Sequence, residues 1–172
     1  MKKLLILLFS ILVSFNSYGE IQHDYYSNGQ IKSETNYKDG NSDGKWTYWY
    51  KSGQKSYEKN YKDDKKHGKW IGWHYNGRKS GKQKSEGNYK DGKKNDKWTY
   101  WYKSGQIKSE NHYKDDELDV KSTRWHKNGQ KKSEGNFKNG KSDGKWTVWN
   151  ENGQIESEAI YKEGECISGD CP

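Results

Sequence analysis

The sequence has few of the residues from which most protein cores are built. Residues 20–172 contain only 11 Ile, Leu, Val and Ala, against 9 Trp, 13 Tyr and 1 Phe. A core made from these residues must be thin and flat. Charged residues make up 33% of the chain, a composition typical of disordered proteins. Disordered segments are also poor in aromatic residues, however, and this chain is rich in them. Aromatic side chains bury about 150–250 Å² each and can cover a sheet without a second layer.

Proline, helical patterns and long apolar segments are also missing after residue 19. The single proline is Pro172, so no proline interrupts strand pairing. No apolar i, i+3, i+4 run reaches helical length, and no stretch is apolar enough to cross a membrane. These absences favour an all-β chain.

Sequence motifs for catalysis are absent. There is no H-E-x-x-H pair for a metal, no G-x-S-x-G nucleophile elbow and no recurring carboxylate pair with apolar neighbours. His74 and His126 stand where Tyr50 and Tyr102 stand in other repeats, which makes them substitutions in an aromatic row. We therefore expect a protein that is not an enzyme and that holds no cofactor or metal.

One segment matches half of a calcium-binding loop. Residues 39–44, DGNSDG, fit the first ligand positions, but Tyr50 stands where the closing Glu should be. Lys141 occupies the third ligand position in another copy. The segment is therefore better interpreted as a loop that connects two strands.

The first nineteen residues have the layout of a signal peptide. Lys2 and Lys3 precede an apolar run over 4–15, and Ser17 and Gly19 supply small residues at the −3 and −1 positions. The alternative is a membrane anchor, but the run is shorter than the roughly 20 residues that span a bilayer. We therefore expect export to the periplasm, the cell surface or the medium.

Positive charge is spread over the whole chain. The net charge is +8, or +6 without Lys2 and Lys3, and lysines are interleaved with Asp and Glu in the repeats. This pattern predicts a solvated mixed surface and no nucleic-acid partner. The positive excess could still attract anionic cell-surface polymers or lipids.

A 24-residue repeat organises the rest of the chain. Glycines that end x-x-G turns recur every 24 residues. One interval is 28 residues long, because it contains a four-residue insertion near 78–81. These glycines are Gly29, Gly53, Gly77, Gly105, Gly129 and Gly153. Two tryptophan series keep the same interval: Trp46, Trp70, Trp98 and Trp146, and Trp49, Trp73, Trp101, Trp125 and Trp149. The first series lacks a member at Ser122, so the fourth repeat is degenerate there.

Each repeat contains two predicted strands. In the first copy, period-two alternation predicts strands over 30–38 and 45–50, joined by a loop over 39–44 and followed by a turn over 51–53. We therefore predict an all-β, elongated monomer. Its single antiparallel sheet is a β-meander of about six 24-residue hairpin repeats, with about twelve short strands.

The repeat resembles a known family. The runs YKDG (37–40) and GKW (44–46), with Asn28-Gly29 turns, are similar to the MORN repeat variant, and more closely to the bacterial YwqK-type antitoxins of toxin–antitoxin systems. The resemblance covers about 25–164, within a repeat domain over 20–164. It implies an extended antiparallel meander that contacts other molecules without catalysis. The second loop glycine of the motif is replaced by Asp96 and Val120 in two copies.

The only cysteines lie in the tail over 165–172. Cys166 and Cys171 form an even pair, which predicts a disulfide in an exported protein. The alternative is two free thiols. A disulfide here would finish the open end of the sheet, where an unpaired edge strand invites aggregation.

Three functions fit these features. We expect an exported, non-enzymatic protein-interaction module or scaffold at the cell envelope, with an unidentified protein as its partner. The alternatives are an antitoxin or immunity protein that neutralises a partner toxin, and a module that binds cell-wall carbohydrate.

The two tryptophan series predict different surfaces. Trp46 shares its predicted strand face with Tyr48 and Tyr50, whereas Trp49 shares its face with Thr47 and lies beside Lys and Glu of the neighbouring strand. We expect the Trp46 series to be packed. The accessible, positively fringed binding face is then formed by Trp49, Trp73, Trp101, Trp125 and Trp149. The alternative is that both series only stabilise the sheet.

Export gives the first testable prediction. We expect the mature chain to begin near Glu20, because cleavage follows a small residue at the −1 position. N-terminal sequencing of the protein from envelope and medium fractions measures this directly. Recovery of a soluble cytoplasmic protein that retains Met1 would contradict it.

Overall fold

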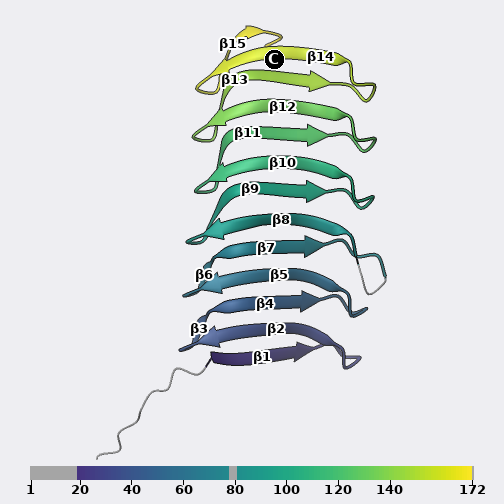
Figure 1. Ribbon diagram of the computed structural model, residues 1–172, viewed down its shortest axis with the longest axis vertical. Coiled ribbons are helices and arrows are strands. Elements are labelled where there is room, and N and C mark those ends of the chain that lie inside the picture. Colours follow the sequence, from purple (N-terminus) through teal and green to yellow (C-terminus); the bar gives the residue numbers. More distant parts are fainter. Residues whose placement is uncertain (1–18, 78–80, 172) are drawn as a thin grey trace, which may run out of the picture.

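One antiparallel sheet makes up the whole fold. The structure, a computed structural model, describes residues 19–77 and 81–171, so the predicted signal peptide lies outside the described residues except for Gly19. In these ranges all regular structure is strand, which confirms the all-β meander (Figure 1). The strands are β1 (Gly19–Tyr25), β2 (Ile31–Lys38), β3 (Asn41–Ser42), β4 (Gly44–Trp49), β5 (Lys55–Lys62), β6 (Lys65–Lys66), β7 (Gly68–Trp73), β8 (Gln83–Lys90), β9 (Lys93–Trp101), β10 (Ile107–Lys114), β11 (Glu117–Trp125), β12 (Lys131–Lys138), β13 (Lys141–Trp149), β14 (Ile155–Lys162) and β15 (Glu165–Gly169).

Each strand pairs with its neighbours in the chain. The path through the sheet runs from β1 to β15 in sequence order, while β3 and β6 are two-residue strands that pair only with β2 and β5. Figure 1 shows the strands stacked along the long axis, with the ends of the sheet far apart. The structure adds β1 at the N-terminal edge, which the sequence pattern did not reveal.

The connection over 39–44 is shorter than the sequence indicated. Asp39 and Gly40 both have positive φ, 50° and 81°, as a two-residue type I′ turn requires. Asn41 and Ser42 then already pair with β2 as β3. Gly44, at φ 93°, marks the bulge before β4. The prediction of a six-residue loop over 39–44 was therefore wrong, because turns and bulges favour the same residue types and cannot be told apart in the sequence.

The turns at the other side of the sheet are three-residue loops with a glycine bulge. In the second repeat, the N–H of Gly53 donates to the carbonyl of Tyr50 at 2.8 Å, and the N–H of Tyr50 donates to the carbonyl of Gln54 at 2.7 Å. The same two bonds recur in the turns that begin at Tyr26, Tyr102, His126 and Asn150.

The insertion changes one of these turns. The N–H of His74 donates to the carbonyl of Lys82, which closes a longer loop, of which residues 78–80 are not described. This loop covers Gln54, whose side chain is 0% exposed. Its amide nitrogen donates to the carbonyl of His74 at 2.6 Å, and its amide oxygen accepts from the N–H of Asn76 at 3.2 Å. The buried amide is thus satisfied on both sides.

Within the described part of the chain, no second layer covers the sheet. Among the described residues, the apolar side chains that are buried are Trp98 and Ala159. The other buried positions are mostly small hydroxyl residues at the middle of the strands, such as Ser33 and Thr47. Longer aromatic, Lys and Glu side chains from flanking positions lie over them. Stability therefore depends on contacts between side chains of the same face.

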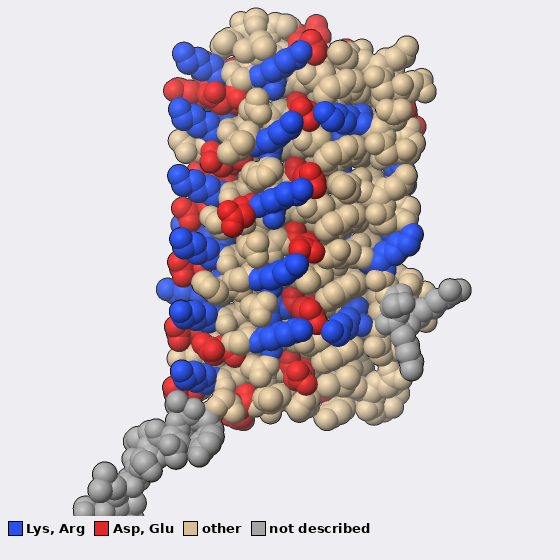
Figure 2. Space-filling view, viewed as in Figure 1, with Lys and Arg blue, Asp and Glu red and all other residues tan. Residues whose placement is uncertain are grey.

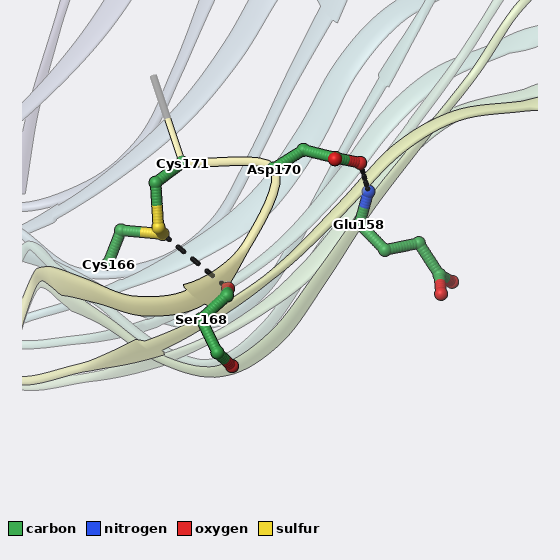
Figure 3. The surroundings of a disulfide bond; sticks show 5 residues. All are labelled: Glu158, Cys166, Ser168, Asp170 and Cys171. Carbon is green, nitrogen blue, oxygen red and sulfur yellow. Dashed lines mark hydrogen bonds between the residues drawn. A yellow bond between two sulfur atoms is a disulfide. The ribbon is translucent and has the colours of Figure 1, made fainter.

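The two edges of the sheet differ. At the C-terminal edge, Cys166 and Cys171 are joined by a disulfide with Cα atoms 5.7 Å apart (Figure 3). The turn places Asp170 on β14: its N–H donates to the carbonyl of Glu158 at 2.8 Å, and its carboxylate accepts from the N–H of Glu158 at 3.0 Å. At the other edge, every residue of β1 is exposed.

A bulge residue generates a stability prediction. Val120 stands at the position of Gly44 with φ 68°, a conformation that is strained for a β-branched residue, and its side chain is 64% exposed. We expect Val120→Gly to stabilise the protein by about 1 kcal/mol, since such strain costs about 1–3 kcal/mol and glycine costs about 0.5–1. Thermal unfolding measures the change.

Val148 provides the matched control. It is half-buried in β13 and pairs with Ser133 and Ser157. Val148→Gly should destabilise the protein, because it relieves no positive φ and removes packing. A lower melting temperature for Val120→Gly as well would show that the bulge is unstrained.

Candidate functional site

Strand pairing places the two tryptophan series on opposite faces. Tyr48 pairs with Tyr57, whereas Thr47 pairs with Glu58, and side chains alternate along β4. The Trp46 face therefore has Trp46, Trp70, Trp98 and Trp146 with the tyrosines. The Trp49 face has Trp49, Trp73, Trp101, Trp125 and Trp149 with threonine, lysine and glutamate. The glutamates of the first strand of each repeat lie beside the Trp49 series, as expected. Not all of the lysines do, because a bulge turns Lys84 to the Trp46 face, where its ammonium lies over the ring of Tyr57.

A ladder of aromatic rings crosses the Trp46 face. From Tyr37 to Trp98, tyrosine and tryptophan alternate with ring centroids 4.6–5.5 Å apart. Phe137 and Trp146 form the corresponding pair at 5.7 Å in the fifth repeat. Aromatic pairs in such tilted or edge arrangements contribute about 0.5–1.5 kcal/mol each. The ladder joins one repeat to the next.

The indole nitrogens of this ladder are satisfied within the fold. Trp46, Trp70 and Trp98 donate to the carbonyls of the Asn residues ten positions earlier at 2.8, 2.9 and 3.0 Å. Trp98 is buried, and the other members of the series are half-buried. These contacts indicate that the Trp46 series is structural.

The ladder is interrupted at the degenerate fourth repeat. The rings of Trp98 and Trp146 lie against Gly87 and Gly135, where an added Cβ would be 2.1 and 1.9 Å from ring atoms. In the fourth repeat the glycine position holds Asn111. The hydroxyl of Ser122 donates to the side-chain oxygen of Asn111 at 2.6 Å. A polar pair thus replaces the tryptophan–glycine pair, a coupling that the sequence analysis missed.

Lysines of the Trp46 face lie over aromatic rings. The ammonium of Lys59 is 4.7 Å from the ring centroid of Tyr48, and that of Lys94 is 4.8 Å from the ring of Trp98. Burial, together with the nearby charge of Lys66, lowers the pKa of Lys59 below its ordinary value. Burial also raises the pKa of Tyr48 to about 12.

Ion pairs cross the Trp49 face in a ladder of their own. Each ion pair links a lysine of the second strand of one repeat to a glutamate of the first strand of the next repeat. The pairs form a column along the middle of this face in Figure 2. The pairs are Lys45–Glu58 (2.8 Å), Lys69–Glu86 (2.5 Å), Lys97–Glu110 (2.5 Å), Lys121–Glu134 (2.9 Å) and Lys145–Glu158 (2.6 Å).

The ion pairs change the protonation of their glutamates. Burial would raise the pKa of Glu58, but hydrogen bonds from Lys45 and Lys55 outweigh it and hold the pKa below its ordinary value of 4.5. For Glu86, the hydrogen bond from Lys69 is the main cause of a lowered pKa. The charges on this face are therefore largely paired.

The proposed binding residues are half-buried. All five members of the Trp49 series are partly exposed at one side of the ion-pair ladder. Lys131 lies with its ammonium 5.6 Å from the ring of Trp149, and it also pairs with Glu134 at 2.9 Å. Since the lysines around these tryptophans are paired with glutamates, the positive charge beside the series is lower than expected. The binding role of this series stays a prediction.

The first residue of each turn bonds to the next repeat, except in the last turn, which begins at Asn150. The hydroxyl of Tyr50 donates to the carbonyl of Trp73 at 2.9 Å, and Tyr102 donates to that of Trp125 at 2.7 Å. The Nε2 atom of His74 reaches the carbonyl of Trp101 at 2.8 Å, and that of His126 reaches Trp149 at 2.8 Å. The imidazole of His can thus replace the phenol of Tyr, because both place a hydrogen-bond donor close enough to the same backbone carbonyl.

Backbone N–H groups bind the carboxylate of Asp43, in the suspected calcium loop, and that of Asp64, in the next repeat. Asp43 accepts from the N–H of Asp63 at 3.4 Å, and Asp64 accepts from the N–H of Ser42 at 2.7 Å. In the described ranges, no group of three or more His, Cys, Asp or Glu residues could hold a metal ion. These side chains connect successive repeats.

Comparison with known families identifies the repeats. The MORN repeat variant family matches residues 24–39, 42–63, 97–115, 118–139 and 142–163, which together exceed half of the chain. The chain belongs to the MORN repeat variant family. The matched ranges omit 64–96, where the insertion lengthens a repeat. No curated protein matches this MORN-variant chain. Within 19–77 and 81–171, no helix is long and apolar enough to span a membrane.

The ion-pair ladder of the MORN-variant sheet predicts acid sensitivity. Because the folded-state pKa values of Glu58, Glu86 and Glu134 lie below their unfolded values, the stabilisation is fully present above about pH 4.5. It is lost as the pH falls through the lowered values. We expect the melting temperature to drop between about pH 5 and pH 3.

One substitution separates this effect from general acid unfolding. Glu58→Gln should cost about 0.5–1 kcal/mol near neutral pH and make the melting temperature less dependent on pH. Glu156→Gln is the control, because Glu156 is exposed and forms no ion pair with another described residue. Identical pH profiles for the two variants would refute a stabilising ladder.

Proposed function

We propose that this protein is a non-catalytic interaction module that binds a protein partner through the Trp49 face. The observation that supports the proposal is the single uncovered layer. A half-buried tryptophan series lies beside paired charges on a face with no second layer. Protein interfaces are likewise enriched in aromatic residues, with polar groups around them. Members of the MORN repeat variant family are typically binding modules without catalysis.

The cell envelope is the proposed location. The apolar run over 4–15 and the small residues before Glu20 support export. A disulfide at the end of the sheet suits an oxidising compartment. An exported monomer with a long repetitive face suits a scaffold, because the same contact recurs at each repeat.

An antitoxin-type role is the second candidate. It is supported by the resemblance of the YKDG and GKW runs to YwqK-type antitoxins. In this form of the proposal the protein partner is a toxin, and the Trp49 face binds it. Expression of a neighbouring toxin gene with and without this protein tests the idea, since an antitoxin must restore growth.

Paired tryptophan substitutions test the binding face. We expect Trp46→Ala with Trp98→Ala to cost several kcal/mol of stability, since tryptophan truncation in a core costs about 3–5 kcal/mol. Trp49→Ala with Trp101→Ala should cost less stability but should abolish binding to envelope proteins. Affinity capture from envelope extracts identifies the partner, and thermal unfolding measures stability.

The two pairs control for each other. Each removes two indoles from the same two repeats, but from opposite faces of β4 and β9. Equal melting losses without a selective loss of binding would mean that both series only hold the sheet together.

A further inference from the structure

Several cations of the Trp46 face have no carboxylate partner. Among the described residues, all lysine–glutamate ion pairs belong to Lys45, Lys55, Lys69, Lys97, Lys121, Lys131 and Lys145. Lys84, Lys108, Lys132 and Arg124 form no ion pair with any described residue. Part of the positive excess of the chain therefore lies where glutamates do not neutralise it.

These four cations lie around two adjacent cavities. The first has a volume of about 320 Å³ and is lined by Lys84, Tyr100, Lys108, Asn111 and Tyr113, among others. The second, also about 320 Å³, is lined by Tyr102, Lys108, Arg124 and Lys132, among others. Both are lined by Lys108 and Ser109, so they are adjacent, and we call the two together the cationic groove. No Asp or Glu lines either cavity.

The groove lies at the break in the aromatic ladder. Tyr100 contacts the ring of Trp98 at 6.1 Å, which places the groove on the Trp46 face. The ring of Trp98 lies against Gly87, on the side away from Asn111. A tryptophan at position 122 would lie against residue 111 in the same way. Ser122 takes its place, is only 3% exposed and lines neither cavity, but its hydroxyl bonds to Asn111, which lines the first cavity.

The cations have a regular spacing. Lys84, Lys108 and Lys132 hold the same position in β8, β10 and β12, which are separated by one strand each. Neighbouring strands are about 4.8 Å apart, so these lysines emerge at intervals of about 10 Å along the groove. A ligand with regularly spaced anionic groups matches them.

We propose that the cationic groove binds an acidic polysaccharide. Tyrosine rings offer flat faces to sugar rings, hydroxyl and amide groups of Ser109 and Asn111 offer hydrogen bonds, and the lysines match carboxylates along the polymer. An acidic peptide is less well suited. Its backbone finds no free strand edge on this face, and ordering a flexible chain costs more than binding a stiff one.

This proposal does not depend on the Trp49 face. The cations of the groove lie on the Trp46 face, but Trp101 and Trp125 of the Trp49 series are also among the residues that line it. The groove is therefore tested with lysine variants, which leave every tryptophan in place.

Binding to defined polymers tests the groove. We expect the purified protein to bind alginate, a polyuronate, and to release it as salt is raised, because screening weakens exposed charge pairs. Neutral dextran should not bind. Titration calorimetry or affinity electrophoresis measures both, with poly-L-glutamate as the peptide probe.

Two variants locate the site. Replacing Lys84, Lys108 and Lys132 by Gln should weaken alginate binding about tenfold. The matched control replaces Lys69, Lys97 and Lys145 by Gln, which removes the same charge from the Trp49 face and should have little effect. A second variant, Asn111→Gly with Ser122→Trp, restores the ladder and places an indole beside the first cavity, so it should weaken binding while remaining folded.

Three outcomes would overturn the proposal. The first is no binding to alginate at low salt. The second is an equal loss in both lysine triple variants, which would show that net charge alone attracts the polymer. The third is binding of poly-L-glutamate as tight as that of alginate, which would assign the groove to acidic peptides.

Discussion

Contact between adjacent repeats is the constraint on which this fold depends. A single sheet has no second layer against which to bury its side chains, so each strand must be covered by its neighbours on the same face. The Tyr37–Trp46–Tyr61 rings and their copies meet this need on one face, and the Lys45–Glu58 pairs do so on the other. Turn residues such as Tyr50 add hydrogen bonds from one repeat to the next. Because every contact is between neighbours, the stability of the sheet is close to a sum over repeats.

The two ladders leave the faces with different chemistry. On the Trp49 face, lysines meet glutamates across strands, so the surface is nearly neutral and its tryptophans lie beside paired charges. On the Trp46 face, the lysines have rings beneath them instead of carboxylates, as Lys59 and Lys94 show. A positive net charge that looks evenly spread in the sequence is therefore unevenly spread in space.

Much of this arrangement follows from the sequence, because the period and the alternation are strong signals. The 24-residue interval and the period-two pattern predicted the meander, the opposite placement of Trp46 and Trp49, and the degenerate position at Ser122. The pattern could not show that residues 39–44 form a turn, a short strand and a bulge, since Gly, Asp and Asn suit all three. It also could not show which lysines are paired. Pairing depends on the register at the bulges, which shifts the neighbours of each charged residue.

The degenerate repeat shows how a repeat protein can gain a site without new structure. In two of the repeats the ring of the tryptophan fills the space above a glycine of the preceding strand: Trp98 lies over Gly87 and Trp146 lies over Gly135. Exchange of tryptophan for Ser122 and of glycine for Asn111 removes one ring contact but leaves the strand pairing of β10 and β11 in place. The lost contact is worth only about 1 kcal/mol. Cations of the neighbouring repeats line the two cavities beside this position, so only a small loss in stability accompanies the proposed cationic groove.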